Sequence, residues 1–294
     1  MMVRALAMIV VLVTAALITS YFVPKTEFDA VLRRAEAGDQ EAQVDLGSMY
    51  SNGSGVTRND DEALKWYLMA ATQGNARAQL LLGAVHLLGR GVQQSGEEAE
   101  RWFRASADQG NASAQNMLGS MYRDGDLITR DYEEAVEWFQ LSAGQGSYEG
   151  QYNLGLMYDE GRGVTQNDEE AVRLYLLAAE QGYANAQVSL GAMYSLGEGV
   201  SRNDREAVKW FRLAAEQGDA RAQYNLGLSY ASGEGVPQNE QRAYVWFSVA
   251  VAQGFMEATS SRNGMRARLS PQALQEAQAL ATRCFESNFE DCGE

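Results

Sequence analysis

The chain has 294 residues, of which 46% are apolar, and carries a formal net charge of −15. The negative charge argues against sequence-independent binding of nucleic acid, because that binding needs Lys and Arg to neutralise phosphates. Length alone predicts two domains. An internal repeat overrules that prediction, because stacked copies are expected to share one continuous core.

Residues 5–23, ALAMIVVLVTAALITSYFV, are uncharged. As a helix this stretch would be about 28 Å long, close to the thickness of the hydrocarbon layer of a bilayer. Residues 1–25 are therefore expected to form either an uncleaved membrane anchor or a cleaved signal peptide. Arg4 and the free amino terminus favour a cytoplasmic start, so the rest of the chain is predicted to be exported.

The next feature is a 36-residue repeat. Its small-residue column falls at Ala42, Ala78, Ala114, Gly150, Ala186, Ala222 and Ala258. A glycine follows five residues after each of the first six, and a tyrosine three residues after that glycine. His86 replaces the tyrosine in the second copy.

Each copy is predicted to form two helices. In residues 39–74, the first half places Ala42, Leu46, Gly47 and Tyr50 on one helical stripe, and the second half forms another stripe. Asn59 with Glu62 three residues later predicts a capping box at the second helix, in which each side chain bonds a backbone donor. The Gln-Gly pair at 73–74 predicts its end.

Aromatic residues repeat along the second helices. Tryptophan occupies one column at 66, 102, 138, 210 and 246, with Leu174 in the fourth copy, and Tyr or Phe fills the adjacent column. Such columns are typical of core packing. In the third copy, Leu127 replaces the second glycine of the interhelical loop, and this turn is expected to have another shape.

These columns resemble the Sel-one-like repeat family, which is related to tetratricopeptide repeats. The resemblance covers residues 26–258, as six full copies after a half copy around Phe28, Val31 and Leu32. It implies an all-α fold, an α/α solenoid of antiparallel helix pairs in a right-handed superhelix, preceded by one N-terminal hydrophobic helix. Residues 259–294 are expected to form a capping helix, with Ser270 and Pro271 at its start, and a cysteine-bearing tail.

By likeness to tetratricopeptide repeats, the first helix of each copy lines a concave face. Positions that vary between copies on that face are candidates for binding a protein or peptide partner. Tyrosine and arginine are favoured there, because both are common interface hot spots. The predicted partner-binding residues are Arg77, Leu80, Asn116, Arg123, Tyr152, Asp159, Arg221 and Tyr224. Solvated or packing roles remain the alternative for each of them.

Little in the sequence suggests catalysis. It lacks the HExxH and GxSxG motifs and a phosphate loop, and His86, in a tyrosine column, is expected to be packed and hydrogen-bonded. No cofactor or metal site is predicted. Cys284 and Cys292 are expected to form a disulfide in an oxidising compartment, or else to be two free thiols.

The predicted function is that of an exported scaffold, tethered to the inner membrane, which binds a protein or peptide in the bacterial envelope. The expected location is the periplasmic side of that membrane, or the periplasm or exterior if the N-terminal segment is cleaved. The chain is expected to be monomeric and non-enzymatic, and to touch the membrane only through residues 5–23. The alternative is an envelope enzyme or penicillin-binding protein, since some cysteine-rich family members are linked to β-lactam hydrolysis.

Overall fold

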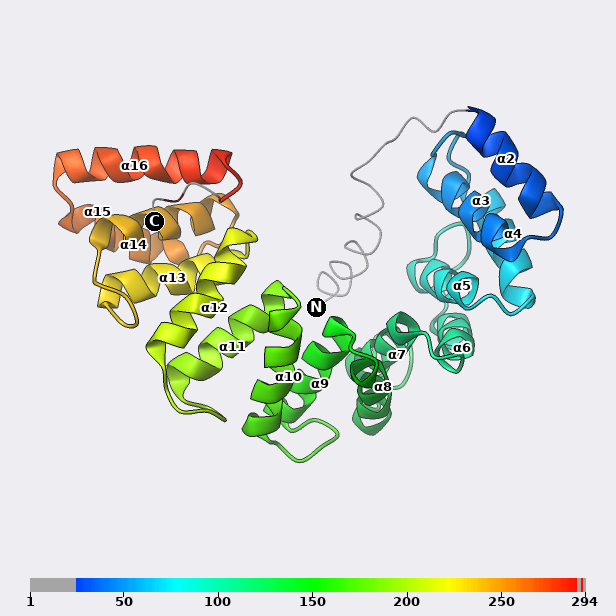
Figure 1. Ribbon diagram of the computed structural model, residues 1–294, viewed down its shortest axis with the longest axis horizontal. Coiled ribbons are helices and arrows are strands. Elements are labelled where there is room, and N and C mark those ends of the chain that lie inside the picture. The colour runs from blue at the N-terminus through cyan, green and yellow to red at the C-terminus, as the bar shows by residue number, and fades with distance from the viewer. Residues whose placement is uncertain (1–24, 290–291, 293–294) are drawn as a thin grey trace. The chain divides into compact units, whose positions relative to one another are not determined.

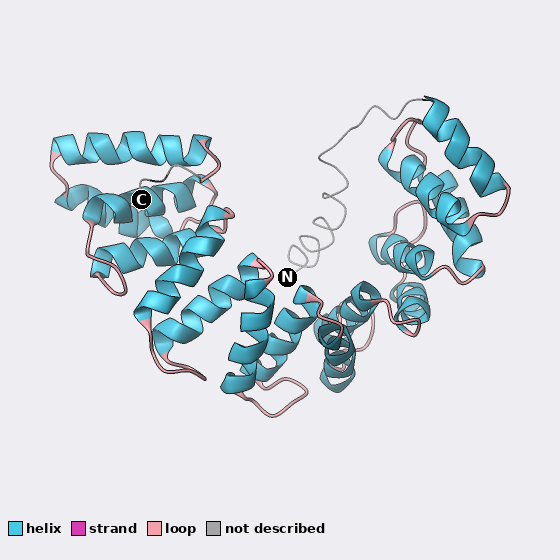
Figure 2. Cartoon of the chain, viewed as in Figure 1, coloured by secondary structure: helices cyan, strands magenta, loops and turns pink. Residues whose placement is uncertain are grey.

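The computed structural model describes residues 25–289 and 292. The predicted N-terminal hydrophobic helix lies outside these residues. The described part of the chain contains 15 α-helices. Figure 2 shows helices and loops in this part, and no strand. It therefore confirms an all-α solenoid of repeated helix pairs.

The helices follow the 36-residue period. The half copy is helix α2 (Lys25–Glu36). The first helices of the six copies are α3 (Gln40–Asn52), α5 (Ala76–Leu88), α7 (Ala112–Asp124), α9 (Tyr148–Glu160), α11 (Ala184–Leu196) and α13 (Ala220–Ser232). The second helices are α4 (Asp60–Thr72), α6 (Gly96–Ala107), α8 (Tyr132–Gly144), α10 (Asp168–Glu180), α12 (Asp204–Glu216) and α14 (Glu240–Ala252). Two further helices follow, α15 (Ala258–Arg268) and α16 (Pro271–Glu286).

The chain divides into two compact units, one ending at Gln145 and the other beginning at Gly146. The first unit holds α2–α8 and the second holds α9–α16; both can be followed by label and colour in Figure 1. The buried residues also fall into separate clusters. Contacts form mainly between helices adjacent in sequence, so each copy packs chiefly on its neighbours, and some residues, such as Tyr50 and Tyr194, pack against two clusters.

Close packing within each copy depends on its glycine. A Cβ atom added to Gly155 would lie 2.7 Å from Cε1 of Tyr175, and one added to Gly191 would lie 2.6 Å from Cε1 of Phe211. The ring of the second helix therefore lies directly on the backbone of the first helix. Corresponding contacts occur in the other copies, which explains why the glycine column is constant.

A pair of glutamines joins each copy to the preceding helix. Gln187 is 3% exposed and donates a hydrogen bond to the carbonyl of Ala179 (3.2 Å), while its own Oε1 accepts one from Gln217 (2.8 Å). The bond between two glutamines recurs as Gln73–Gln43, Gln109–Gln79, Gln145–Gln115, Gln181–Gln151 and Gln253–Gln223. Bonding of this kind satisfies polar groups that would otherwise be costly to bury.

The helix starts confirm one half of the capping box. Asn59 accepts hydrogen bonds from the backbone of Asp61 and Glu62, but its own N–H donates to the carbonyl of Tyr50 (2.9 Å), not to Glu62. The reciprocal bond predicted for the glutamate is therefore not the one formed. Glu62 instead pairs with Lys65 at 3.4 Å. Asn239 also caps its helix, although Arg242 stands in the glutamate position.

The C-terminal region contains one helix more than predicted. α15 begins at Ala258, on the small-residue column, and α16 follows with Ser270 as its cap and Pro271 in its first turn. The two helices pack on α14. α15 thus stands where a seventh first helix would begin, and α16 completes the pair.

The unusual loop of the third copy is matched by a second substitution. In the fifth copy, the second loop glycine, Gly199, lies against the backbone of Asp168, the first residue of α10. In the third copy the loop residue is Leu127, and the first residue of α6 is Gly96. A Cβ atom added to Gly96 would lie 2.7 Å from Cβ of Leu127. In the fifth copy the loop supplies the glycine of this contact, whereas in the third copy the helix supplies it.

The contact between Leu127 and Gly96 predicts that substitutions at these two positions have non-additive effects on the free energy of unfolding. Gly96→Ala should lower the free energy of unfolding by about 1–3 kcal/mol, because the methyl group overpacks the contact with Leu127. Leu127→Gly added to it should recover part of that loss, because the loop regains the residue found in other copies. Urea unfolding of the two single variants and the double variant measures the coupling, and strictly additive effects would contradict the explanation.

Candidate functional site

The predicted binding residues of the first unit have structural roles. Arg77 is exposed, with its Nη1 3.1 Å from Asp45 and 3.6 Å from Glu41 on the preceding first helix. Leu80 is half-buried and packs against the cluster that contains Phe103. Arg77 remains accessible to a partner, whereas Leu80 offers little surface.

Two other predictions in this unit fail on accessibility. Asn116 is only 8% exposed. Arg123 has 18% of its side chain exposed, because it pairs with Asp124 at 2.8 Å and lies over the ring of Phe139. Sequence columns gave no sign of this burial, since both positions vary between copies. We therefore remove Asn116 and Arg123 from the candidate surface.

The second unit carries a cluster of tyrosines. Tyr183 lies between Tyr148 and Tyr152, with ring centroids 5.1 Å and 5.2 Å away, and Tyr152 also packs on Tyr175 at 5.7 Å. Tyr148 is 39% exposed, while Tyr152 and Tyr183 are half-buried. We call Tyr148, Tyr152 and Tyr183 the aromatic patch. It combines apolar ring surface with phenol groups at the start of α9 and α11.

Polar side chains hold this region in place. Asp159 accepts a hydrogen bond from the hydroxyl of Tyr175 (2.9 Å) and so supports the ring beneath Tyr152. Arg221 donates to Asp219 and to Asn185, both at 2.6 Å. Because 47% of its side chain is exposed, Arg221 presents a cation beside the patch, on the next first helix.

Tyr224 forms a second aromatic group further along the same unit. Its ring lies 5.6 Å from Phe247 and 5.4 Å from Phe255. Phe255 and Tyr183 hold the same position in their copies, where other copies have Asn, Asp or Ser as a helix cap. Tyr183 accordingly makes no capping bond.

Sequence reasoning missed Tyr148, Tyr183 and Phe255 as candidates for binding. The signal was present in two of them, because Tyr183 and Phe255 replace capping residues and give up the stabilisation that a cap provides, typically about 1 kcal/mol. A search for aromatic residues at capping positions, 31 residues after another aromatic residue, would have identified Tyr152 with Tyr183 and Tyr224 with Phe255.

The phenol of Tyr148 remains protonated over a wide pH range. Partial burial, together with a hydrogen bond to Glu149, raises the pKa of Tyr148 to about 12. Burial also raises the pKa of Tyr183. Both groups therefore offer neutral hydroxyls as hydrogen-bond donors at physiological pH.

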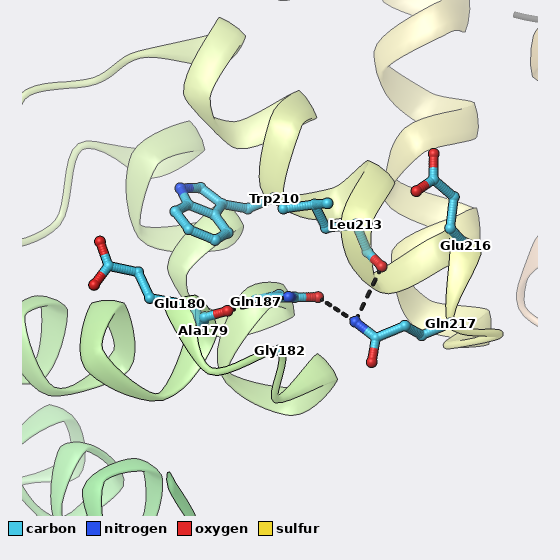
Figure 3. Close-up of a pocket in the computed structure, with 8 residues that line it drawn as sticks. All are labelled: Ala179, Glu180, Gly182, Gln187, Trp210, Leu213, Glu216 and Gln217. Carbon is cyan, nitrogen blue, oxygen red and sulfur yellow. Dashed lines mark hydrogen bonds between the residues drawn. The ribbon is translucent and has the colours of Figure 1, made fainter. Parts of the chain in front are cut away.

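A cleft lies where α10 and α12 approach each other (Figure 3). It is lined by Ala179, Glu180, Gly182, Gln187, Trp210, Leu213, Glu216 and Gln217. The hydrogen-bonded pair of Gln187 and Gln217 lies at its base, Trp210 and Leu213 form an apolar wall, and the two glutamates lie at its ends. We call it the α10–α12 cleft. No pattern in the sequence indicates it.

The C-terminal tail is held to the second unit. Cys284 and Cys292 form a disulfide, with Cα atoms 4.4 Å apart, and both are buried. Phe289, between them, is 8% exposed and belongs to the same cluster of buried residues. The cysteines therefore fix the tail against the last copies.

The geometry provides little for catalysis. His86 lies in the tyrosine column, where the hydroxyl of Tyr122 donates to Glu100 at 2.6 Å. The residue equivalent to Glu100 one copy earlier is Leu64, and Nδ1 of His86 is buried without a hydrogen-bond partner. The expectation of a packed histidine thus holds, whereas within the described residues its Nδ1 makes none of the expected hydrogen bonding. Within the described residues, no cluster of His, Cys, Asp and Glu is arranged to hold a metal ion.

Comparison with known proteins places the repeats in a family. The family model for the Sel1 repeat matches six times, at residues 40–75, 76–111, 112–147, 149–183, 184–219 and 220–255. No curated protein matches the sequence.

Two solved structures are similar over most of the chain. A Sel1 repeat protein from Oxalobacter formigenes is 29% identical, with a TM-score of 0.67, over 76% of this chain and 96% of the other. A protective antigen with an SLR fold from uropathogenic Escherichia coli is 32% identical, with a TM-score of 0.58, over 90% of this chain and 66% of the other. These comparisons give no support to an envelope enzyme, and the architecture is that of a protein-interaction scaffold. The chain belongs to the Sel1 repeat family.

Proposed function

We propose that the chain is a scaffold that holds a protein or peptide segment on the first helices of its second unit. The observation that carries the proposal is the aromatic patch beside Arg221. Tyr148 is 39% exposed, and Tyr183 is a half-buried residue at the edge of the core, in a position where a helix cap would be more stabilising. Partly exposed tyrosines supported by buried rings provide large contact area at a low entropy cost.

The charges near the patch favour a particular kind of partner segment. Arg221 presents an exposed guanidinium, whereas Glu149 lies beside Tyr148 at the other edge. A segment with an apolar or aromatic residue over the tyrosines and an acidic group near Arg221 would pair with both features. The chain is proposed to act as a monomer.

Loss of the patch should abolish binding without unfolding the chain. In-cell cross-linking followed by mass spectrometry would compare tagged wild type with the variant Tyr148→Ala/Arg221→Glu. Both side chains are substantially exposed, so helicity and melting temperature should stay unchanged. A partner protein recovered with the wild type should fall at least about tenfold in the variant, which corresponds to loss of a hot spot.

The repeat offers a matched control for this experiment. Gln40 in the first copy and Arg77 in the second copy hold the positions that Tyr148 and Arg221 hold in the fourth and sixth copies. Gln40→Ala/Arg77→Glu should leave partner recovery unchanged. Equal partner recovery with the wild type and both double variants would contradict the placement of the site on the second unit. An equal loss of partner recovery in both double variants would contradict it as well.

We also propose that the scaffold is exported and tethered to the inner membrane, facing the periplasm. Residues 5–23 are uncharged and long enough to span a bilayer, and they lie outside the described residues. No helix in the described part of the chain is long and apolar enough to cross a membrane. The bonded cysteine pair supports export, because disulfides persist in oxidising compartments.

Export and anchoring predict two results. The protein should sediment with membranes and need detergent for release, with an intact mass that includes the hydrophobic segment. Its cysteines should react with a maleimide only after reduction. Release by osmotic shock with a shorter mass would replace the anchor by a cleaved signal, and thiols that react without reduction would contradict export.

A further inference from the structure

The α10–α12 cleft has a counterpart one copy later, and there the chain fills it with its own side chain. Adding 36 to the lining residues Gly182, Trp210 and Leu213 gives Gly218, Trp246 and Val249, between α12 and α14. A Cβ atom built on Gly218 would lie 2.9 Å from Cε2 of Phe289. The ring of Phe289 therefore occupies this second cleft.

The burial of matching residues confirms that one cleft is filled and the other is open. Leu213 is 38% exposed, whereas Val249, its counterpart, is 1% exposed. A Cβ atom on Gly182 would have no atom within 4 Å, in contrast to Gly218. Trp210 is itself 6% exposed and its indole Nε1 has no hydrogen-bond partner among the described residues. The open cleft thus has an apolar wall of the kind that an aromatic ring covers in its neighbour (Figure 3).

The two clefts differ in charge. Glu180 and Glu216 lie at the ends of the α10–α12 cleft, and both are exposed. Their counterparts in the filled cleft are Glu216 and Ala252, so the filled cleft has one carboxylate instead of two. The segment around Phe289 is itself acidic, with Glu286, Glu290 and Asp291. The single carboxylate of the filled cleft is compatible with that acidic tail, whereas the two carboxylates of the α10–α12 cleft would repel it more strongly.

We propose that the α10–α12 cleft binds an aromatic side chain of a partner protein, flanked in the partner's sequence by Lys or Arg. The ring would lie over Gly182 against Trp210 and Leu213, as Phe289 lies over Gly218. The flanking cations would pair with Glu180 and Glu216. The acidic C-terminal tail of a second copy is disfavoured as the occupant by the same two carboxylates.

This site is separate from the aromatic patch. The patch is formed by residues at the starts of the first helices α9 and α11, whereas the cleft is lined chiefly by the second helices α10 and α12. Variants of one surface leave the other intact, so each proposal fails or holds by itself.

A photo-reactive peptide tests the proposal on the full chain in detergent. The probe is acetyl-Lys-Ser-Asn-Bpa-Lys-Lys-amide, in which benzoylphenylalanine (Bpa) replaces the aromatic residue of the tail and lysines replace its acidic residues. The comparison peptide keeps the acidic residues, as Glu-Ser-Asn-Bpa-Glu-Asp. Mass spectrometry after irradiation should find the basic probe attached to residues 179–182, to Gln187 or to residues 210–217, with at least about threefold less labelling by the acidic peptide.

Two variants and a control identify the groups involved. Leu213→Asn should abolish labelling by the basic probe, because it removes part of the apolar wall without changing the charge, and Glu180→Gln/Glu216→Gln should remove the preference for the basic peptide. Leu141 holds the same column in the third copy and is 52% exposed, so Leu141→Asn is the matched control and should change nothing. Circular dichroism verifies that all variants are folded.

Other labelling patterns would overturn the proposal. Equal labelling by both peptides would refute the charge preference, and labelling of residues 246–253 would show that the probe displaces Phe289 instead of entering the open cleft. Labelling confined to Tyr148 and Tyr183 would refute this site while leaving the function proposed for the aromatic patch intact.

Discussion

The contact between a glycine of the first helix and an aromatic ring of the second is the constraint on which each copy depends. A methyl group at Gly155 or Gly191 would lie within 2.7 Å of the facing ring, so no larger residue fits without moving the helices apart. The ring and the glycine together fix how the two helices of a copy pack. The paired glutamines Gln217 and Gln187 bond to each other within their copy, and Gln187 also donates to the carbonyl of Ala179 on the preceding second helix. Repetition of these two contacts leaves the remaining positions free to vary.

Function is proposed to lie in those free positions, and the second unit uses them differently from the first. In the first unit, Arg77 pairs with carboxylates and Arg123 packs on a ring. In the second unit, Tyr148 and Tyr183 stack at the starts of first helices, and Phe289 of the tail enters a cleft between second helices. The same scaffold therefore has two kinds of aromatic contact, one proposed for a partner at the patch and one made by the chain's own tail.

The sequence predicted the helix pairs, their caps and their stops because each depends on residues close together in the chain. Gly74 and Gly182, for example, take the left-handed conformation expected after Gln. It did not predict what depends on residues from neighbouring copies. The exchange between Gly96 and Leu127, the bond from Gln187 to the carbonyl of Ala179 and the α10–α12 cleft all arise across a repeat junction. Tyr183 is intermediate, because its departure from the capping column was visible but its stacking partners were not.

The central claim is that a partner segment lies over the aromatic patch in the cell. The most direct measurement places a photo-reactive benzoylphenylalanine at position 148 and, in a second protein, at position 40, its equivalent in the first copy. The account predicts a discrete cross-linked partner from position 148 and none from position 40. Cross-linking from position 40 alone, or the same products from both positions, would contradict it.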